Sequence, residues 1–480
     1  MSENFFLQSV AFVFLVSQWN YTVTGQTLSA PKQQALKDIQ DLSAEMTKMS
    51  DQIWAFAELA FQEKKSAQVL IDFARKEGFR VQSEAYDIPT AFVAEYGSGR
   101  PIIGILGEFD ALPGLSQQAR PEKNPVLVGA PGHGCGHNLF GVGSLAAATA
   151  IKRLIDQGAL RGTIRFYGTP AEEKYFGKVF MATAGAFADL DVCLDWHPGA
   201  TNAANTQTSR ALVDFNVDFY GKTAHASLDP WNGYSAVDAL EFFTSGINYL
   251  REHVKPSLRM HYQILHAGEA ANIVPDHASL WVRVRDVTRE GMLPVYERVK
   301  RIAQGAAIMA EVDYKITLIS GLHELLVNRT GAEILHKNMS LIGPINYSEE
   351  EINYAKEIQR QTGHPQEGLD GRIQPLTPTL PDPAGASTDV GDVSWIVPEI
   401  SLSATTGALG SPWHSWAVTA CGGMSIGHKG MIFAAKSLAL TMIDLYQDEQ
   451  LVQAIKTEFR NRKGSYIYQP ILGDLEPWKG

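Results

Sequence analysis

Residues 101–110, PIIGILGEFD, start as an apolar run and end with two carboxylates, Glu108 and Asp110. Short apolar runs of this kind recur along the first part of the chain, at 91–94, 102–106, 164–167 and 192–194. An Ala-rich segment between two of them, residues 139–155, favours a helix. Continuous apolar runs that alternate with helices are typical of strands buried on both faces of a parallel sheet. We therefore expect an α/β fold built on a mainly parallel sheet.

A different pattern begins near Ala211. Phe215, Val217 and Phe219 alternate with polar residues, which indicates a strand with one exposed face. The following segments predict a helix, two strands, a helix and a strand, at 235–253, 258–265, 280–285, 294–309 and 312–319. This β-α-β-β-α-β order is that of a ferredoxin-like split βαβ unit.

The inserted unit divides the chain into parts. We expect residues 209–324 to form a small domain, and residues 31–208 and 325–480 to form together the large domain that carries the parallel sheet. Residues 359–386 are rich in Pro, Gly and Thr, which predicts a long surface loop or insertion.

The N-terminal residues 1–30 are expected to lie outside the core. Residues 5–16 are apolar but too few to span a bilayer as a helix. They resemble the apolar region of a secretory signal, yet no Lys or Arg precedes them. Two alternatives remain open: residues 1–25 are a signal peptide of a periplasmic or secreted protein, or they are an extension of a cytoplasmic one.

Composition excludes several classes of protein. The 480 residues are 45% apolar, which excludes a mainly disordered chain. The 41 Lys+Arg are outnumbered by 52 Asp+Glu and form no basic block, so we expect no nucleic-acid partner. No later stretch is long and apolar enough for a bilayer, so we expect no membrane partner. Three cysteines are too few for a disulfide framework.

Polar groups follow three of the apolar runs, and a fourth precedes the Ala-rich helix. They are Glu108–Asp110, Glu172-Glu173, Trp196-His197 and the segment HGCGHN at 133–138. In an open α/β sheet, sites form beyond the carboxyl ends of the strands. A lone His or a Glu pair is usually an ordinary surface feature, but four such groups at one edge indicate a divalent-metal site.

Two of these groups suggest specific chemistry. Gly136 allows a sharp turn that lets Cys135 and His137 face one ion, and a metal-bound Cys135 thiolate would suit a bridge between two ions. Of the neighbours Glu172 and Glu173, one can bind metal while the other takes a proton from water. Two weaker candidates lie in the inserted unit: His225, as an oxyanion donor, and Asn272, as a ligand for a substrate carboxylate or carbonyl.

The motifs together resemble the metal-dependent amidohydrolase and metallopeptidase family that includes aminoacylase, carboxypeptidase G and the auxin-conjugate hydrolases. The stretches that carry the resemblance are 108–113, 132–138, 170–173, 196–197, 221–226, 272–275 and 412–415. Three segments, 132–138, 387–395 and 428–431, look most like the branch of the family that contains the B subunits of p-aminobenzoyl-glutamate hydrolases. One departure is Glu108, which stands where peptidase relatives carry a histidine, so Cys135 is expected to replace that ligand.

The resemblance implies a role for each candidate residue. The metal ligands would be Cys135, His137, Glu173, His197 and His414. Glu172 would act as general base and then general acid, and Asp110 would orient a histidine ligand. His225 would reach the active site of the opposite protomer, while Asn272 and Arg285 would meet the substrate carboxylate or the oxyanion.

The implied function is hydrolysis of the amide bond of an N-acyl amino acid, with p-aminobenzoyl-glutamate as the expected substrate. Two divalent ions per subunit, manganese or zinc, would serve as cofactors. The inserted domain would act as dimerisation and lid domain, in a homodimer or in a heterodimer with a related subunit. Two alternatives remain: other N-acyl or auxin-like conjugates or dipeptides as substrates, and a non-catalytic subunit of a two-subunit hydrolase.

Overall fold

The computed structural model describes residues 28–380 and 385–479. The signal or extension expected at the N-terminus falls almost entirely on residues 1–27, outside the described residues, and stays a prediction. Within the described part of the chain, no helix has the length and apolar content needed to cross a membrane.

The large domain is built on a seven-stranded sheet. Its strands lie in the order β1 (Arg80–Ser83), β2 (Phe92–Ser98), β4 (Gly162–Gly168), β3 (Ile102–Gly107), β5 (Val192–Gly199), β11 (Glu399–Thr405) and β6 (Ala203–Ala204). The four neighbouring strands β4, β3, β5 and β11 are parallel, whereas β1, β2 and β6 pair antiparallel at the two edges. The prediction of a mainly parallel sheet is confirmed.

Helices cover both faces of this sheet. One face packs against α1 (Ala30–Phe56), α2 (Lys64–Lys76), α3 (His137–Asp156), α7 (Arg329–Ile342) and α11 (Ser425–Gln447). The other packs against α4 (Gly177–Thr183) and α9 (Val390–Ser394). Ile105 and Leu106 are neighbours in β3 but belong to these two opposite cores, because successive strand residues point to opposite faces. The expected continuous apolar runs follow from burial on both sides.

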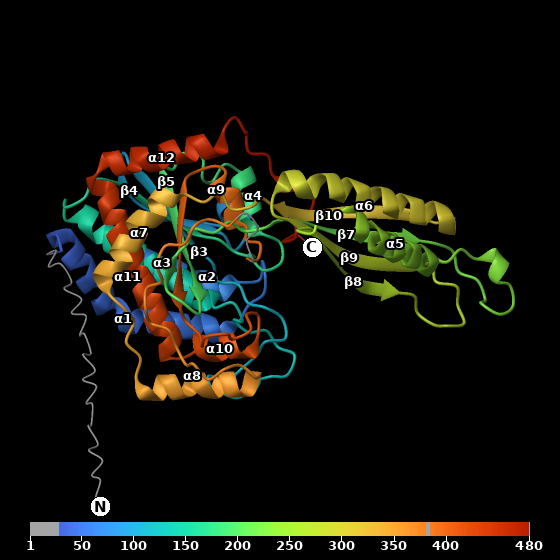
Figure 1. Cartoon of the computed structure of the whole chain (residues 1–480), viewed down its shortest axis with the longest axis horizontal. Helices are drawn as coiled ribbons and strands as arrows, with labels where there is room; N and C mark the ends of the chain where they lie inside the picture. The colour runs from blue at the N-terminus through green and yellow to red at the C-terminus, as the bar shows by residue number, and fades with distance from the viewer. Residues whose placement is uncertain (1–27, 381–384, 480) are drawn as a thin grey trace, which may run out of the picture.

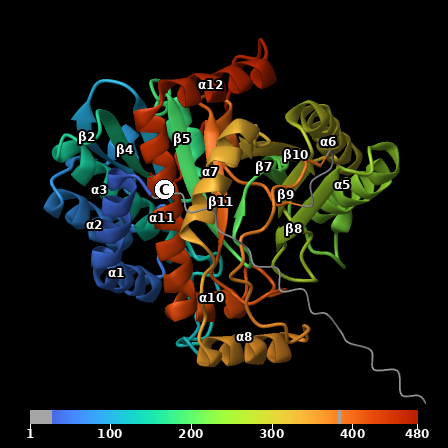
Figure 2. The same ribbon diagram turned by 60° about the vertical axis from the view of Figure 1, so that its left-hand side comes forward.

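Three more helices complete the large domain. They are α8 (Glu349–Thr362), α10 (Trp416–Gly422) and α12 (Glu449–Lys463). Figure 2 shows α12 along one end of the sheet and α8 at the opposite end.

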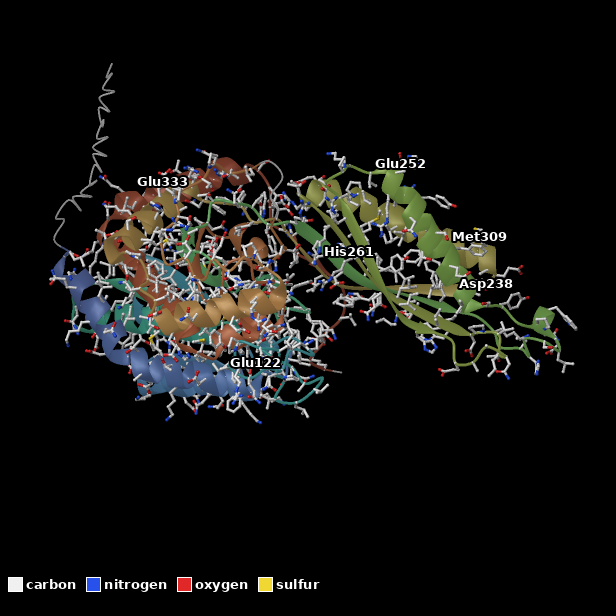
Figure 3. All side chains as sticks on the ribbon, turned by 60° about the horizontal axis from the view of Figure 1, so that its bottom comes forward. Glu122, Asp238, Glu252, His261, Met309 and Glu333 are labelled. Atoms are coloured by element: carbon white, nitrogen blue, oxygen red, sulfur yellow. The ribbon has the colours of Figure 1, made fainter. Side chains whose placement is uncertain are left out.

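The inserted domain is a second, antiparallel sheet with two helices. Its elements follow the predicted β-α-β-β-α-β order: β7 (Ala211–Tyr220), α5 (Ala236–Leu250), β8 (Arg259–Ala267), β9 (His277–Asp286), α6 (Arg289–Ala310) and β10 (Asp313–Leu322). Apolar residues of β7 and β9 pack against α5 and α6 in a core separate from the other two. Figures 1 and 3 show this domain as a lobe projecting from the large one, with Asp238 and Met309 toward its outer end.

The C-terminus departs from the predicted domain division. Residues 325–480 were all expected in the large domain, but the short strand β12 (Ile471–Leu472) pairs with β10 and extends the inserted sheet to the order β12-β10-β7-β9-β8. A strand of two residues is too short to show the alternation of apolar and polar residues by which strands are predicted from sequence. The last residues of the chain therefore link the two domains.

Candidate metal centre and active site

The predicted polar groups meet at the carboxyl edge of the parallel strands. Glu108 and Asp110 follow β3, Glu172 and Glu173 follow β4, and His197 lies near the end of β5. These strands are hydrogen-bonded neighbours, so the residues at their ends lie side by side. The open α/β sheet thus positions the cluster where the sequence predicted it.

Cys135 and His137 enter the cluster from the start of α3. The glycine between them, Gly136, has φ +81°, a left-handed conformation that glycine adopts without strain. His414 has φ +56° although it is not glycine, and its backbone N–H donates to the carbonyl of Gly134 at 3.1 Å. Backbone strain of this kind is characteristic of functional sites. The hydrogen bond from His414 to Gly134 fixes the two segments to each other.

Hydrogen bonds set which ring nitrogen of each histidine faces the cluster. His137 Nδ1 donates to Asp110 Oδ1 at 2.8 Å, and His197 Nδ1 donates to the carbonyl of Pro198 at 2.7 Å. In both rings Nε2 is therefore the nitrogen that faces the other candidate ligands, and it would be the atom that binds a metal. Asp110 therefore fixes the orientation of the His137 ring, and its role beside a metal stays a prediction.

The remaining ligand atoms face one another at short range. Cys135 Sγ lies 3.4 Å from His197 Nε2, and Glu173 Oε2 lies 3.5 Å from His414 Nε2. Two groups of three could each hold an ion: Cys135, His137 and His197 in one, Cys135, Glu173 and His414 in the other. Cys135 belongs to both, so the geometry fits the predicted thiolate bridge.

Buried polar atoms without hydrogen-bond partners mark the same place. Among the described residues Glu108 Oε2, His137 Nε2 and Glu173 Oε1 make no hydrogen bond, although Glu108 Oε2 and His137 Nε2 lie 3.0 Å apart. An unsatisfied buried donor or acceptor costs about 1–3 kcal/mol, more for a charged group. Cations at the centre of the cluster would satisfy all three atoms, so the residues present fit divalent ions.

Burial and mutual repulsion perturb the titration of the cluster. Burial, then the charges of Glu108 and Glu173, raise the pKa of Glu172 well above its usual value. Burial raises the pKa of Glu173 to about 7 and also raises that of the Cys135 thiol. Burial lowers the pKa of His197 to about 4, which keeps the ring neutral as a ligand must be. Divalent cations would keep the thiolate and carboxylates ionised.

Three acidic or basic residues of this site were not assigned roles from sequence. Glu108 Oε2 lies 3.0 Å from His137 Nε2, and a third possible ion-binding group consists of Glu108, His137 and Glu172. Lys178, at the start of α4, donates to Glu108 Oε1 at 2.6 Å and to Asp389 Oδ1 at 2.7 Å, and all three side chains are buried. The position of Glu108 directly after a core strand was a usable signal, whereas nothing near Lys178 marked it as buried.

His133, which lies in the same segment as Cys135 and His137, has a structural role. Its Nε2 donates to the carbonyl of Ile53 in α1, and burial lowers the pKa of His133 to about 4. Cys193 and Cys421 lie in two apolar clusters of the large domain.

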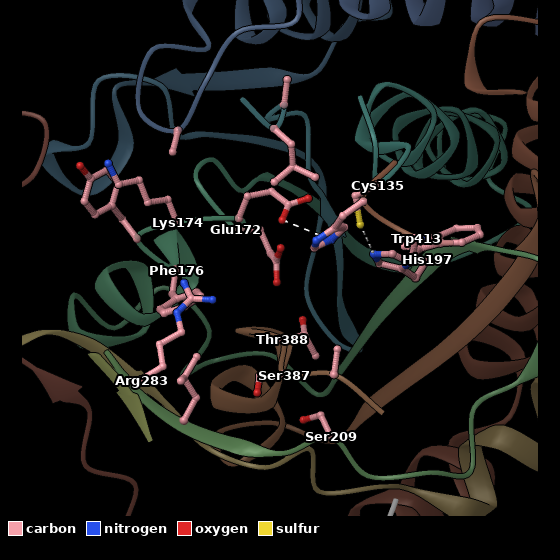
Figure 4. Close-up of a pocket in the computed structure, with 18 of the residues that line it drawn as sticks. Cys135, Glu172, Lys174, Phe176, His197, Ser209, Arg283, Ser387, Thr388 and Trp413 are labelled. Carbon is pink, nitrogen blue, oxygen red and sulfur yellow. Dashed lines mark hydrogen bonds and ion pairs between the residues drawn. The ribbon is translucent and has the colours of Figure 1, made fainter. Parts of the chain in front are cut away.

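The cluster forms one wall of a cavity of about 1170 Å³ between the two domains. Figure 4 shows the Glu172 carboxylate pointing into this pocket, with Cys135 and His197 on one side and Arg283 on the other. The inserted domain contributes Trp281, Arg283 and Arg285 from β9. The pocket therefore combines the candidate ligands with two guanidinium groups.

The three candidates of the inserted domain do not lie together. Arg285 lines the pocket, and its Nε is buried without a hydrogen-bond partner among the described residues. His225 and Asn272 are exposed and are absent from the lining of this pocket. Their loops pair with each other, since Ala226 N–H donates to the carbonyl of Asn272 at 3.1 Å. His225 follows the end of β7, and Asn272 lies between β8 and β9. Both loops are at the end of the lobe that points away from the large domain (Figure 1).

Comparison with known proteins agrees with this site and fold. Residues 208–314 match the model of the peptidase dimerisation domain of the M20 family. The B subunit of the p-aminobenzoyl-glutamate hydrolase of Escherichia coli is 37% identical over 459 residues, which cover 90% of this chain and 95% of the relative. The chain belongs to the M20 peptidase family. Human Xaa-Arg dipeptidase is a more distant relative, 28% identical over 88% of this chain and 90% of its own length.

Solved structures of the M20 family share the fold. The YXEP protein of Bacillus subtilis, described as a dinuclear metal binding peptidase of this family, superposes with a TM-score of 0.56 at 17% identity and covers 85% of this chain and 99% of its own. An aminobenzoyl-glutamate utilization protein of Klebsiella pneumoniae gives 0.58 at 18% identity, over 86% and 98%. The chain is thus an M20 hydrolase with a dimerisation domain, and the predicted family and fold are confirmed.

Proposed function

We propose that this M20 hydrolase is a two-metal amidohydrolase that cleaves N-acyl amino acids, with p-aminobenzoyl-glutamate as substrate. The observation that carries the proposal is the convergence of Cys135, His137, Glu173, His197 and His414 around buried, unpartnered polar atoms, with Glu172 beside them in the pocket. The Escherichia coli relative, a p-aminobenzoyl-glutamate hydrolase component, supports the choice of substrate.

The candidate ligands would hold two divalent ions, manganese or zinc. Cys135 would bind both, with His137 and His197 on one side of it and Glu173 and His414 on the other. Such ions supply Lewis acidity, which lowers the pKa of water and polarises a carbonyl. Mixed thiolate, imidazole and carboxylate ligands suit zinc, and carboxylates also suit manganese.

Glu172 would transfer the proton. Its carboxylate accepts a proton from the attacking water and then gives it to the nitrogen of the leaving amino acid. Burial raises the pKa of Glu172 above its usual value, which is the direction expected of a carboxylate that accepts a proton and later releases it. The carboxylate of its neighbour Glu173 instead faces another candidate ligand, with Oε2 3.5 Å from His414 Nε2.

A matched pair of substitutions tests these two roles. Glu172→Gln should leave metal content unchanged and reduce kcat by about 10²–10⁴-fold, the usual contribution of general acid–base catalysis. Glu173→Gln should instead lower the bound metal per chain. Metal content by elemental analysis and amine release from p-aminobenzoyl-glutamate measure the two effects. Near wild-type turnover in Glu172→Gln would reject the assignment.

The charge of the pocket supports an acidic amino acid in the substrate. Arg283 is held by Asp214, whereas Arg285 Nε has no partner among the described residues and is available to a carboxylate. A substrate ending in arginine would place a third guanidinium beside these two. A panel of p-aminobenzoyl-glutamate, acetyl-glutamate, an auxin-type conjugate and an arginine dipeptide, assayed by amine release, should show preference for the glutamates.

We further propose that His225 and Asn272 act in the pocket of the opposite protomer. Both lie on paired loops outside the pocket of their own chain, so they would enter a partner's site together. The dimerisation domain supports a dimer, formed with a second copy or with a related subunit.

Mixing two inactive variants tests action across the dimer. A Glu172→Gln chain carries an intact His225, and a His225→Ala chain carries an intact Glu172. Mixed dimers therefore contain one complete site, and activity should return after mixing. Lack of recovery in dimers shown to be mixed would reject the proposal. If the purified wild-type chain with manganese or zinc is inactive alone, and Glu172→Gln does not reduce the activity of its complex with a related subunit, the non-catalytic alternative is correct.

A further inference from the structure

The last residues of the chain form a strap, residues 464–479, that follows α12 and crosses to the inserted domain. Within it, β12 pairs antiparallel with β10, with Ser320 opposite Leu472 and Gly321 opposite Ile471. The approach is close, since a Cβ atom on Gly321 would lie 2.5 Å from the Ile471 side chain. Figure 1 shows the segment after α12 running to the junction of the two lobes.

Two tyrosines anchor the strap before it reaches β10. Tyr468 Oη donates to Asp392 Oδ1 at 3.0 Å, and Tyr466 Oη lies 2.9 Å from His323 Nε2. The Arg289 guanidinium stacks on the Tyr466 ring, 3.7 Å from its centroid. These contacts join α9, the end of β10 and the start of α6. The course of the strap is therefore set by specific contacts.

The end of the strap reaches the active-site pocket. Pro477 and Trp478 line the same cavity as Glu172. The Trp478 ring packs edge-on against Phe61 and Phe180, with centroids 5.0 and 5.1 Å apart. Its Nε1–H is buried and has no hydrogen-bond partner among the described residues, so ring packing holds Trp478 in place.

Phe61 also stacks on Tyr175, with the two centroids 5.6 Å apart. Tyr175 stands three residues after Glu172, so the aromatic wall begins close to the proposed base. Tyr175, Phe61 and Trp478 thus form a continuous aromatic lining, contributed by three distant parts of the chain. Aromatic walls favour flat apolar ligands, because rings pair in stacked or edge-on arrangements.

We propose that the strap is part of the active site, and that Trp478, with Phe61 and Tyr175, forms a subsite for a planar aromatic group of the substrate. The inference rests on the proposed amidohydrolase function and assigns the specificity for an aryl acyl group to these side chains. Trp478 is then a specificity-determining residue that takes no part in proton transfer or metal binding.

Substitution of Trp478 in the metal-loaded, full-length protein tests the subsite. With Trp478→Leu, kcat/KM for p-aminobenzoyl-glutamate should fall about tenfold, mainly through KM. The kcat/KM of Trp478→Leu for acetyl-glutamate should stay unchanged. Trp478→Phe should keep most of the activity on p-aminobenzoyl-glutamate, because it keeps an aromatic ring. The adjacent Lys479→Ala is the control. An equal fall for both substrates, or no fall for either, would overturn the proposal.

Ligand binding separates failure of the subsite from failure of the proposed function. If the wild-type protein hydrolyses none of the N-acyl glutamates, the proposed function fails, and calorimetry with p-aminobenzoate then decides the subsite. Wild-type protein should bind p-aminobenzoate about tenfold more tightly than Trp478→Leu, while acetate binds both equally. No binding by wild-type protein, or equal affinity in the two proteins, would overturn the subsite.

Discussion

Replacement of Lys178 by methionine should destabilise the metal-free protein strongly. The ammonium is fully buried between the carboxylates of Glu108 and Asp389, at 2.6 and 2.7 Å. The backbone N–H of Lys178 donates to Asp389 as well, at 2.9 Å. Methionine keeps the length and packing of the side chain, so the substitution isolates the loss of the charge. Two acids would remain buried without their counter-ion.

The expected magnitude follows from the geometry. Removal of one partner of a buried ion pair costs about 3–5 kcal/mol. With an unfolding entropy of about 2.1 cal/mol/K per residue, a large domain of this size should lose about 5 °C in Tm. The loss should be smaller in the metal-loaded protein, because divalent ions near Glu108 compensate part of the uncovered charge.

Thermal unfolding of chelator-treated and metal-loaded protein measures both effects. Lys48→Met, on the exposed side of α1, is a matched control that should change Tm by about 1 °C or less. A decrease in the free energy of unfolding below about 1 kcal/mol in metal-free Lys178→Met would refute the reasoning. It would show that Glu108 and Asp389 are neutral without the lysine.

Three further substitutions test other parts of the structure. Asp110→Asn should weaken metal binding about 10–100-fold in a chelator competition, because His137 loses the carboxylate that fixes its ring. Arg285→Leu should raise KM for acyl-glutamates about 10–100-fold with little change in kcat. Glu399→Gln should raise Tm more at pH 8 than at pH 5. Burial raises the pKa of Glu399 and that of Asp195, to about 6 for Asp195, so the stability that depends on their protons is lost as pH rises.

Each of these substitutions has a result that would contradict it. If Asp110→Asn leaves the metal affinity unchanged, Asp110 does not orient a metal ligand. If Arg285→Leu raises KM equally for an analogue whose carboxylate is replaced by an uncharged amide, Arg285 does not bind the substrate carboxylate. A Glu399→Gln protein whose gain in Tm is the same at both pH values would show that its carboxyl does not need a proton in the folded state. Glu367→Gln, in an exposed loop, is the control for that experiment.

The sequence predicted the parts of the fold that repeat a local pattern. The apolar run at 102–106 and the alternation at 215–219 predicted strands of the correct two kinds, because burial on two faces or on one face leaves a different period. The order of elements then identified the ferredoxin-like unit. The strap was missed because β12 is two residues long and is defined by its partner β10. Pairing across distant parts of the chain leaves no local period.

The same distinction applies to the site. The groups that follow core strands and the Cys135–His137 segment before α3 could be predicted to meet, and Cys135, His137, Glu173 and His197 do so. His414, which only the family resemblance implied, joins them. The buried Lys178 could not be predicted, since α4 has no pattern that separates a buried lysine from an exposed one. Sequence alone also could not show that the loops of His225 and Asn272 pair with each other, or that both residues lie away from Arg285. Which loops pair is decided by the antiparallel sheet.

The arrangement of the pocket separates chemistry from specificity within one loop. Ala171 and Phe176, both with left-handed backbone conformations, bracket a turn that presents Glu172 and Glu173 to the metal cluster and Tyr175 to the aromatic wall. Substitutions in the wall or in the strap can therefore change the acyl group that fits without moving a metal ligand. Under the proposed function, the Trp478 wall would select the acyl group and Arg285 the amino acid, so members of one family could differ in substrate and keep the same metal ligands. This division also predicts that selectivity among N-acyl amino acids changes with Trp478, whereas metal content does not.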